Sequence, residues 1–77
     1  MADDILLCDL RVGEVGKIVE LSLTDRKNIG KMMRLGIIPG VSVCLLRRRP
    51  GFILQIGYTK VAVDRRLAAL IRVRRQH

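Results

Sequence analysis

The stretch that decides the fold is RLGIIPGVSV, residues 34–43. Gly36 is predicted to end a helix, because a glycine has no Cβ and adopts the left-handed conformation that caps helix C-termini. Pro39-Gly40 suits the two central positions of a type II turn, where proline fixes φ at about −65° and glycine accepts a positive φ. The alternating pattern that follows predicts a strand. These residues therefore predict a helix, a tight turn and a strand in immediate succession.

A helix is predicted over about residues 25–35. Thr24 or Asp25 provides a side-chain oxygen that caps an unpaired backbone N–H at its start. Gly30 lies inside the helix, where glycine costs about 1 kcal/mol relative to alanine. We therefore expect a close backbone approach at Gly30.

The predicted helix has two distinct faces at about 100° per residue. An apolar face is expected to pack against the core, and its methionines are expected to be core residues rather than metal ligands. The opposite face is basic and aligned at i, i+4 and i+7. The apolar face carries Ile29, Met32 and Met33, and the basic face carries Lys27, Lys31 and Arg34.

Short strands account for most of the remaining chain. Parallel strands would need crossovers of about a dozen residues, and only one connection is that long, so a small antiparallel barrel is expected. The fold class is mainly β with one inserted helix and one short helical turn. Strands are predicted at about 16–23, 41–46, 52–58, 60–64 and 71–73, and the helical turn at about 65–70 is capped by Asp64.

The composition indicates one small folded domain of 77 residues, with a core spanning about 6–74. Apolar residues make up 49% of the chain, but Phe52 and Tyr58 are its two aromatic residues. Two cysteines are too few for a disulfide framework, the first residues are acidic rather than basic, and no apolar run approaches the ~20 residues that span a bilayer. We expect a cytoplasmic protein without membrane insertion.

Residue types that perform catalysis are sparse. The single histidine is His77, and no nucleophile–base set or phosphate-binding glycine loop is present. Cys8 and Cys44 do not have metal-ligand spacing, and Cys44 is expected to be a buried small apolar residue. The sequence therefore argues against an enzyme and against a preformed metal site.

The net charge of +8 indicates an acidic partner or a requirement for solubility. Arg47 and Arg49 should point to one side of a strand and Arg48 to the other, so these three are interpreted mainly as solvating charge. Proteins that bind single-stranded nucleic acid usually place aromatic side chains among the basic ones, and this chain has few. Nucleic acid is therefore not the expected partner.

The motifs together resemble the FeoA family. Residues 34–43 are similar to the family's Leu-Gly-x-x-Pro-Gly motif with its following strand, and further similarity continues to the end of the chain. The matching pieces are Pro50, Gly57-Tyr58, residues 61–63, and Ala68, Ile71 and Val73 in the pattern Ala-x-x-Ile-x-Val, together with the opening residues 9–21. The resemblance covers about residues 6–74.

This resemblance implies an SH3-like β-barrel and a bacterial or archaeal cytoplasmic accessory protein of ferrous iron transport. The implied partner is the cytoplasmic, GTPase-containing part of the FeoB membrane transporter. Two departures from the family pattern bear on partner contacts. Pro50-Gly51 runs straight into the next strand where many members have a longer loop, and Asp64 stands where many have a basic residue.

The leading hypothesis is a docking module that acts by binding, as a monomer or a homodimer. Its predicted contacts are Lys27, Lys31, Arg34, Leu35 and Ile37, with Leu35, Gly36, Pro39 and Gly40 forming the turn motif. No tightly bound cofactor is expected, and Fe²⁺ or another divalent metal enters only by family association. The alternatives are a small basic nucleic-acid-binding barrel and a stand-alone metal-responsive interaction module.

Overall fold

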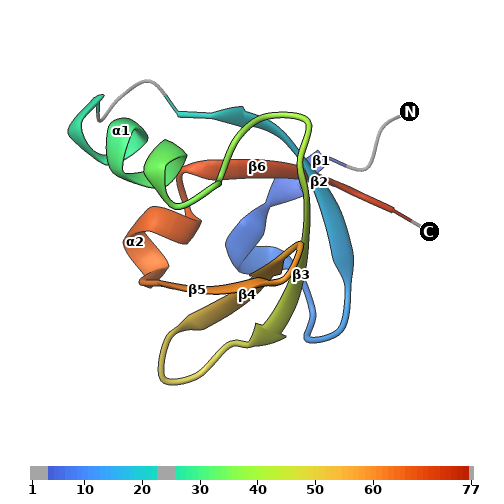
Figure 1. Cartoon of the computed structure of the whole chain (residues 1–77). Helices are drawn as coiled ribbons and strands as arrows, with labels where there is room; N and C mark the ends of the chain where they lie inside the picture. Colours follow the sequence, from blue (N-terminus) through green and yellow to red (C-terminus); the bar gives the residue numbers. More distant parts are fainter. Residues whose placement is uncertain (1–3, 23–25, 77) are drawn as a thin grey trace.

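The computed structural model describes residues 4–22 and 26–76, and Figure 1 shows its arrangement. Most of the chain forms short strands, joined by two α-helices and one 3-10 helix. In chain order the elements are β1 (Asp4–Leu6), η1 (Leu7–Asp9), β2 (Val15–Leu21), α1 (Arg26–Arg34), β3 (Ser42–Arg47), β4 (Phe52–Ile56), β5 (Thr59–Val63), α2 (Arg65–Ala68) and β6 (Ile71–Arg75).

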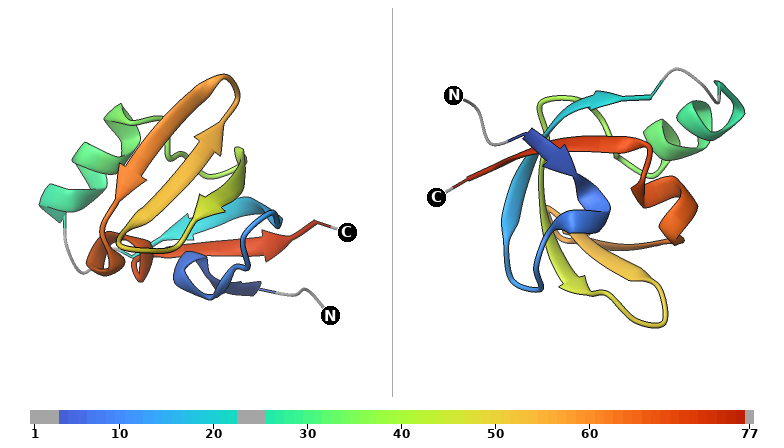
Figure 2. Two further views of the ribbon diagram at one scale, coloured as in Figure 1. Left: turned by 90° about the horizontal axis from the view of Figure 1, so that it is seen from below. Right: turned by 180° about the vertical axis from the view of Figure 1, so that it is seen from behind.

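The six strands form one antiparallel sheet in the order β1-β6-β2-β3-β4-β5. Figure 2 shows that the sheet curls around its own inner face, with α1 and α2 on one side and the chain ends on the other. This arrangement confirms the mainly β, antiparallel fold that the sequence predicted.

The core fills the inside of this curled sheet. Strand side chains alternate between the core and the surface, and a fully buried Leu or Ile contributes about 1.5–3 kcal/mol. Arg72 points outward between two buried neighbours, as predicted. The buried side chains of the strands include Ile18, Leu21, Val43, Leu45, Phe52, Leu54, Val61, Val63, Ile71 and Val73.

The N-terminal strand β1 and the helix η1 were not predicted. β1 has only three residues and pairs with β6 alone, so its sequence shows no alternating pattern to detect. η1 and the residue that follows it place Leu7 and Leu10 in the core, where both are fully buried. The segment before β2 therefore completes the barrel instead of serving only as a turn.

The predicted helix is confirmed as α1, but two expectations about it are wrong. Met32 is fully buried, whereas Met33 is 46% exposed, because it lies at the edge of the apolar face beside the solvent. A Cβ on Gly30 would meet nothing within 4 Å, so no backbone approaches it closely. The predicted caps, Thr24 and Asp25, lie outside the described residues.

The turn after α1 has the predicted geometry. Gly36 and Gly40 have φ values of +91° and +95°, in the left-handed region where glycine is favoured. The Val41 N–H donates to the Ile38 carbonyl across Pro39-Gly40 at 3.1 Å, which closes the predicted turn. This closure brings the chain directly from α1 into β3.

The short helix α2 also begins as predicted. The Asp64 side chain accepts a hydrogen bond from the Leu67 N–H at 2.8 Å, which satisfies a donor that the first helical turn leaves unpaired. Within the described ranges, neither helix has the length and apolarity needed to cross a membrane.

Candidate functional site

The excess positive charge comes from one continuous part of the chain. Residues 26–63 carry eight Lys or Arg and no Asp or Glu, while the rest of the chain carries seven of each. Residues 26–63 comprise α1, β3, β4 and β5, and we call them the acid-free half. The charge-balanced half comprises β1, β2, α2 and β6.

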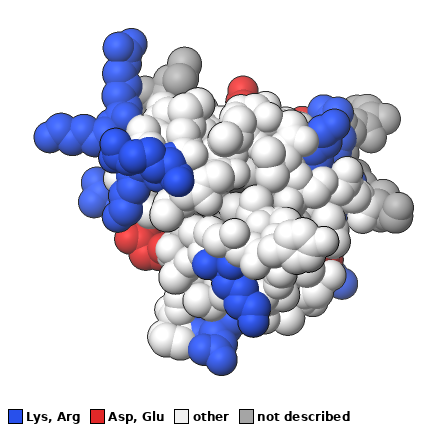
Figure 3. Space-filling model, in the orientation of Figure 1, with Lys and Arg blue, Asp and Glu red and all other residues white. Residues whose placement is uncertain are grey.

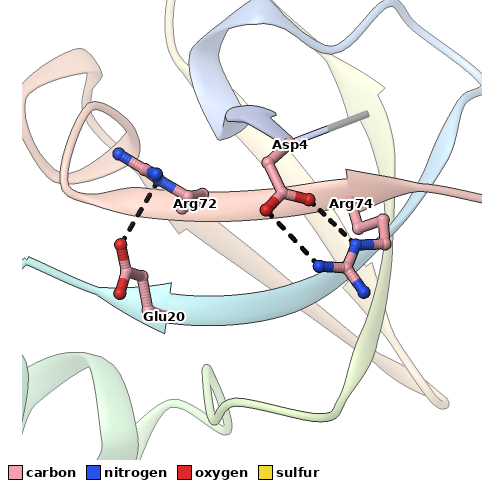
Figure 4. Close-up of polar contacts among 4 residues, drawn as sticks. All are labelled: Asp4, Glu20, Arg72 and Arg74. Carbon is pink, nitrogen blue, oxygen red and sulfur yellow. Dashed lines mark hydrogen bonds and ion pairs between the residues drawn. The ribbon is translucent and has the colours of Figure 1, made fainter. Parts of the chain in front are cut away.

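In the charge-balanced half, the arginines of β6 pair with acids. Strand β6 lies between β1 and β2, and it directs arginines to both neighbours: Arg74 to Asp4 at 2.9 Å and Arg72 to Glu20 at 3.4 Å (Figure 4). Each exposed pair contributes little, typically ~0–1 kcal/mol. The other cations of this half, Arg11, Lys17, Arg65 and Arg66, are exposed without an ion pair among the described residues.

Two carboxylates of this half are held in their charged form. The hydrogen bond from Arg74 and its positive charge lower the pKa of Asp4 below the ordinary value. The pKa of Glu14 is lowered by the hydrogen bond from the Arg11 backbone N–H and by the Arg75 guanidinium, 3.1 Å away. The arrangement stabilises the fold and offers no proton donor for catalysis near neutral pH.

The predicted basic contacts lie on the outer side of α1. Lys27, Lys31 and Arg34 are all exposed, and none pairs with an acid among residues 4–22 and 26–76. Their spacing aligns them along the helix, so they form a basic ridge. In Figure 3 this is the blue group at the upper left, where α1 lies in Figure 1.

The turn after α1 presents apolar side chains beside this ridge. Leu35 is 37% exposed and Ile38 is 44% exposed, so both are accessible to a partner. Ile37 was also predicted as a contact, but its side chain is fully buried in the core and is not exposed to a partner in this structure. The neighbouring turn between β4 and β5 carries Tyr58, which is fully exposed and was not predicted as a site residue.

A second group of cations lies on the outer face of β3, β4 and β5. Arg47 and Lys60 line a hollow of about 340 Å³, whose other lining residues are Leu46 and Ile53. Sequence reasoning treated Arg47 as solvating charge and did not consider Lys60. The absence of acids between residues 26 and 63 was the pattern that could have revealed them.

Arg48 differs from the other cations of the acid-free half. Its guanidinium donates a hydrogen bond to the Leu10 carbonyl and lies 5.6 Å from the centre of the Phe52 ring. This arrangement joins the β3–β4 loop to the segment after η1 and includes a cation–π contact. The interpretation of Arg48 as solvating charge is therefore wrong, whereas Arg47 and Arg49 are exposed as predicted.

Metal-binding residue types do not cluster in the part of the chain that the structure describes. No three His, Cys, Asp or Glu side chains there lie close enough to hold an ion together. Cys8 and Cys44 are both partly buried and free, so Cys44 is less enclosed than predicted.

Comparison with known proteins agrees with this structure. The family model described as FeoA domain matches residues 5–75. The chain belongs to the FeoA family. No curated protein sequence matches it.

Solved structures show the same fold at low sequence identity. An iron uptake regulatory protein, FeoA, is 23% identical with a TM-score of 0.87, and the match covers 95% of this chain and 97% of that one. A FeoA-like protein from Clostridium acetobutylicum is 20% identical with a TM-score of 0.87, over 100% and 94% of the two chains. A manganese-dependent transcriptional repressor is 22% identical with a TM-score of 0.91, over 99% of this chain but 44% of the repressor.

The architecture is therefore the SH3-like FeoA fold, as the sequence resemblance implied. The FeoA family is associated with ferrous iron transport and is not a known family of enzymes.

Proposed function

We propose that this chain is a non-catalytic cytoplasmic accessory protein of ferrous iron transport. It docks on the cytoplasmic, GTPase-containing part of a FeoB-type membrane transporter. Family membership supports the transport context, and the exposed basic ridge of Lys27, Lys31 and Arg34 carries the docking proposal. Iron enters as the cargo of the transporter, and no cofactor held by this chain is required.

Docking is driven by charge and by apolar burial. The ridge attracts an acidic surface and raises the rate of encounter, and Leu35 then packs against the partner. Binding shifts the transporter toward whichever conformation presents the complementary surface. Such a shift adjusts transport or nucleotide turnover without chemistry on this chain.

The test is a titration of the full chain against the purified cytoplasmic domain of the transporter encoded in the same genome. The variant Lys27→Glu/Lys31→Glu should bind at least about tenfold more weakly, since two attractive contacts become repulsive. Arg11→Glu/Lys17→Glu makes the same change in net charge on the charge-balanced half and should change affinity less than about threefold. Equal losses from the two variants, or no binding by the unmodified chain, would refute the proposal.

A further inference from the structure

We infer that the docking surface extends from α1 across to β3 as one basic face with an uncharged centre. Its centre is Leu35, Ile38 and Tyr58, and its flanks are the α1 ridge on one side and Arg47 with Lys60 on the other. The partner it fits presents an apolar contact flanked on two sides by carboxylates. This inference rests on the proposed function and adds the centre and the second flank to it.

The turn after α1 lies against the end of strand β4. A Cβ placed on Gly36 would lie 4.0 Å from the Ile56 Cγ2 atom, so the 35–38 turn adjoins the β4–β5 turn. The β4–β5 turn is supported by the Gln55 side chain, whose Nε2 donates to the Gly57 carbonyl at 3.0 Å. Tyr58 is therefore presented on a turn that adjoins the turn after α1.

The second flank follows from the register of the strands. Lys60 pairs with Gln55 across β4 and β5, two residues after Tyr58. Lys60 and Arg47 line the same hollow, with Leu46 and Ile53 as its apolar lining. Every residue named for this surface lies within residues 26–63, which contain no Asp or Glu.

The centre of the face is apolar and open. Figure 3 shows a broad uncharged area between the Lys and Arg of α1 at the upper left and those in the lower part of the molecule. Tyr58 is fully exposed, and tyrosine is enriched among residues that dominate binding energy because it combines a large apolar ring with a polar end. An aromatic residue at the centre with charges around it has the composition of a protein-binding surface.

A second copy of this chain is a poor occupant for this face. A two-fold interface places the same patch on both subunits, which would bring the basic ridge and its equivalent together. The face is also poorly suited to single-stranded nucleic acid, since Tyr58 is the one aromatic side chain exposed on the described residues. Charge complementarity with fixed apolar contacts favours an acidic protein surface.

The experiment uses the same cytoplasmic transporter domain as probe, with two variants of the exposed surface. Tyr58→Ala should weaken binding at least about tenfold at every salt concentration, because it removes apolar contact area. Arg47→Gln/Lys60→Gln should weaken binding about tenfold at low salt and reduce its salt dependence. Val12→Ala is the matched apolar control, because Val12 is 58% exposed in the loop before β2. This variant should bind the domain as tightly as the unmodified chain does.

The outcomes separate this inference from the proposed function. If Tyr58→Ala and Arg47→Gln/Lys60→Gln bind normally while Lys27→Glu/Lys31→Glu does not, the contact is confined to α1 and the wider face is wrong. If the unmodified chain fails to bind the domain, both proposals are wrong. A final titration uses phosphatidylcholine vesicles that contain about 30% phosphatidylglycerol. If the chain binds these vesicles in a way that depends on Tyr58, but does not bind the transporter domain, the partner of this face is a lipid surface and not a protein. Thermal unfolding of each variant confirms that it remains folded.

Discussion

The two halves of the molecule use the same kind of charged residue in different ways. In the charge-balanced half, Arg72, Arg74 and Arg75 each contact an acid on a neighbouring strand or loop. In the acid-free half, most cations face solvent, whereas Arg48 donates a hydrogen bond to the Leu10 carbonyl and lies over the Phe52 ring. The comparison separates the arginines of β6, which pair with acids of the fold, from the solvent-facing cations of the acid-free half, which are available to a partner.

The halves also differ in how they are attached. Strands β1, β2 and β6 are joined by backbone ladders and ion pairs, whereas α1 has a single fully buried side chain. The binding helix is therefore the more weakly anchored element, and its position depends on few contacts.

Met32 tests this attachment and should give the largest effect. Met32→Ala removes the one fully buried side chain of α1 and leaves a cavity, which typically costs about 2–5 kcal/mol. Met33→Ala removes the same number of atoms at a site that is 46% exposed and should cost less than about 1 kcal/mol. Denaturant unfolding monitored by circular dichroism measures both, and equal costs would show that the helix is anchored in another way.

Arg48 tests the exception within the acid-free half. Arg48→Ala loses the hydrogen bond to the Leu10 carbonyl and the contact with Phe52, for an expected cost of about 2 kcal/mol. Arg49→Ala removes a neighbouring exposed arginine and should cost less than about 0.5 kcal/mol. If the two substitutions had the same effect on unfolding, Arg48 would belong with the solvent-facing cations after all.

Gly30 tests whether the exposed helix face can be stabilised without altering binding. Gly30→Ala should raise the free energy of unfolding by about 1 kcal/mol, because no atom lies within 4 Å of the added Cβ. Gly36→Ala is the opposing control and should destabilise, since Gly36 has a φ of +91°. If Gly30→Ala binds the transporter domain with unchanged affinity, the stability of the helix can be raised without altering docking.

Glu14 tests the charge-balanced half and should give the smallest effect. Its lowered pKa in the folded state means that its stabilising contribution is complete above the unfolded value near 4.5 and is lost as pH falls through the folded value. Glu14→Gln should therefore be less stable than the unmodified chain at pH 7, and the difference should shrink below about pH 4.5. Unfolding curves that stay parallel down to pH 3 would contradict this role.

The fold was largely predictable because its turns have strict backbone requirements. Gly36, Pro39 and Gly40 allow few conformations, and they fixed the helix end and the following strand correctly. β1 could not be predicted, since three residues paired with a strand about 70 positions away leave no local pattern. The close backbone approach predicted at Gly30 was wrong, because a helix also tolerates glycine at positions that no other part of the chain approaches.

The candidate site was predicted only in part. Helical periodicity placed Lys27, Lys31 and Arg34 correctly on an exposed ridge, but it could not show that Ile37 turns inward after the helix ends. In the proposed face, Tyr58 comes near the turn after α1 only through folding, since the end of β4 at Ile56 lies beside Gly36. Residues that only folding brings together show no local sequence pattern. The one sequence signal that could have pointed to them is the uneven distribution of acidic residues along the chain.

The pairing of β1 with β6 has a practical consequence for how this small protein can be handled. Asp4 lies opposite Arg74, so the two described ends of the chain are neighbours, and in every view they lie on the side away from α1 (Figures 1 and 2). A tag, a surface linker or a fused domain attached at either end therefore leaves the basic face unobstructed. The same geometry would let a longer protein carry such a barrel as an appended module with its binding side still turned outward.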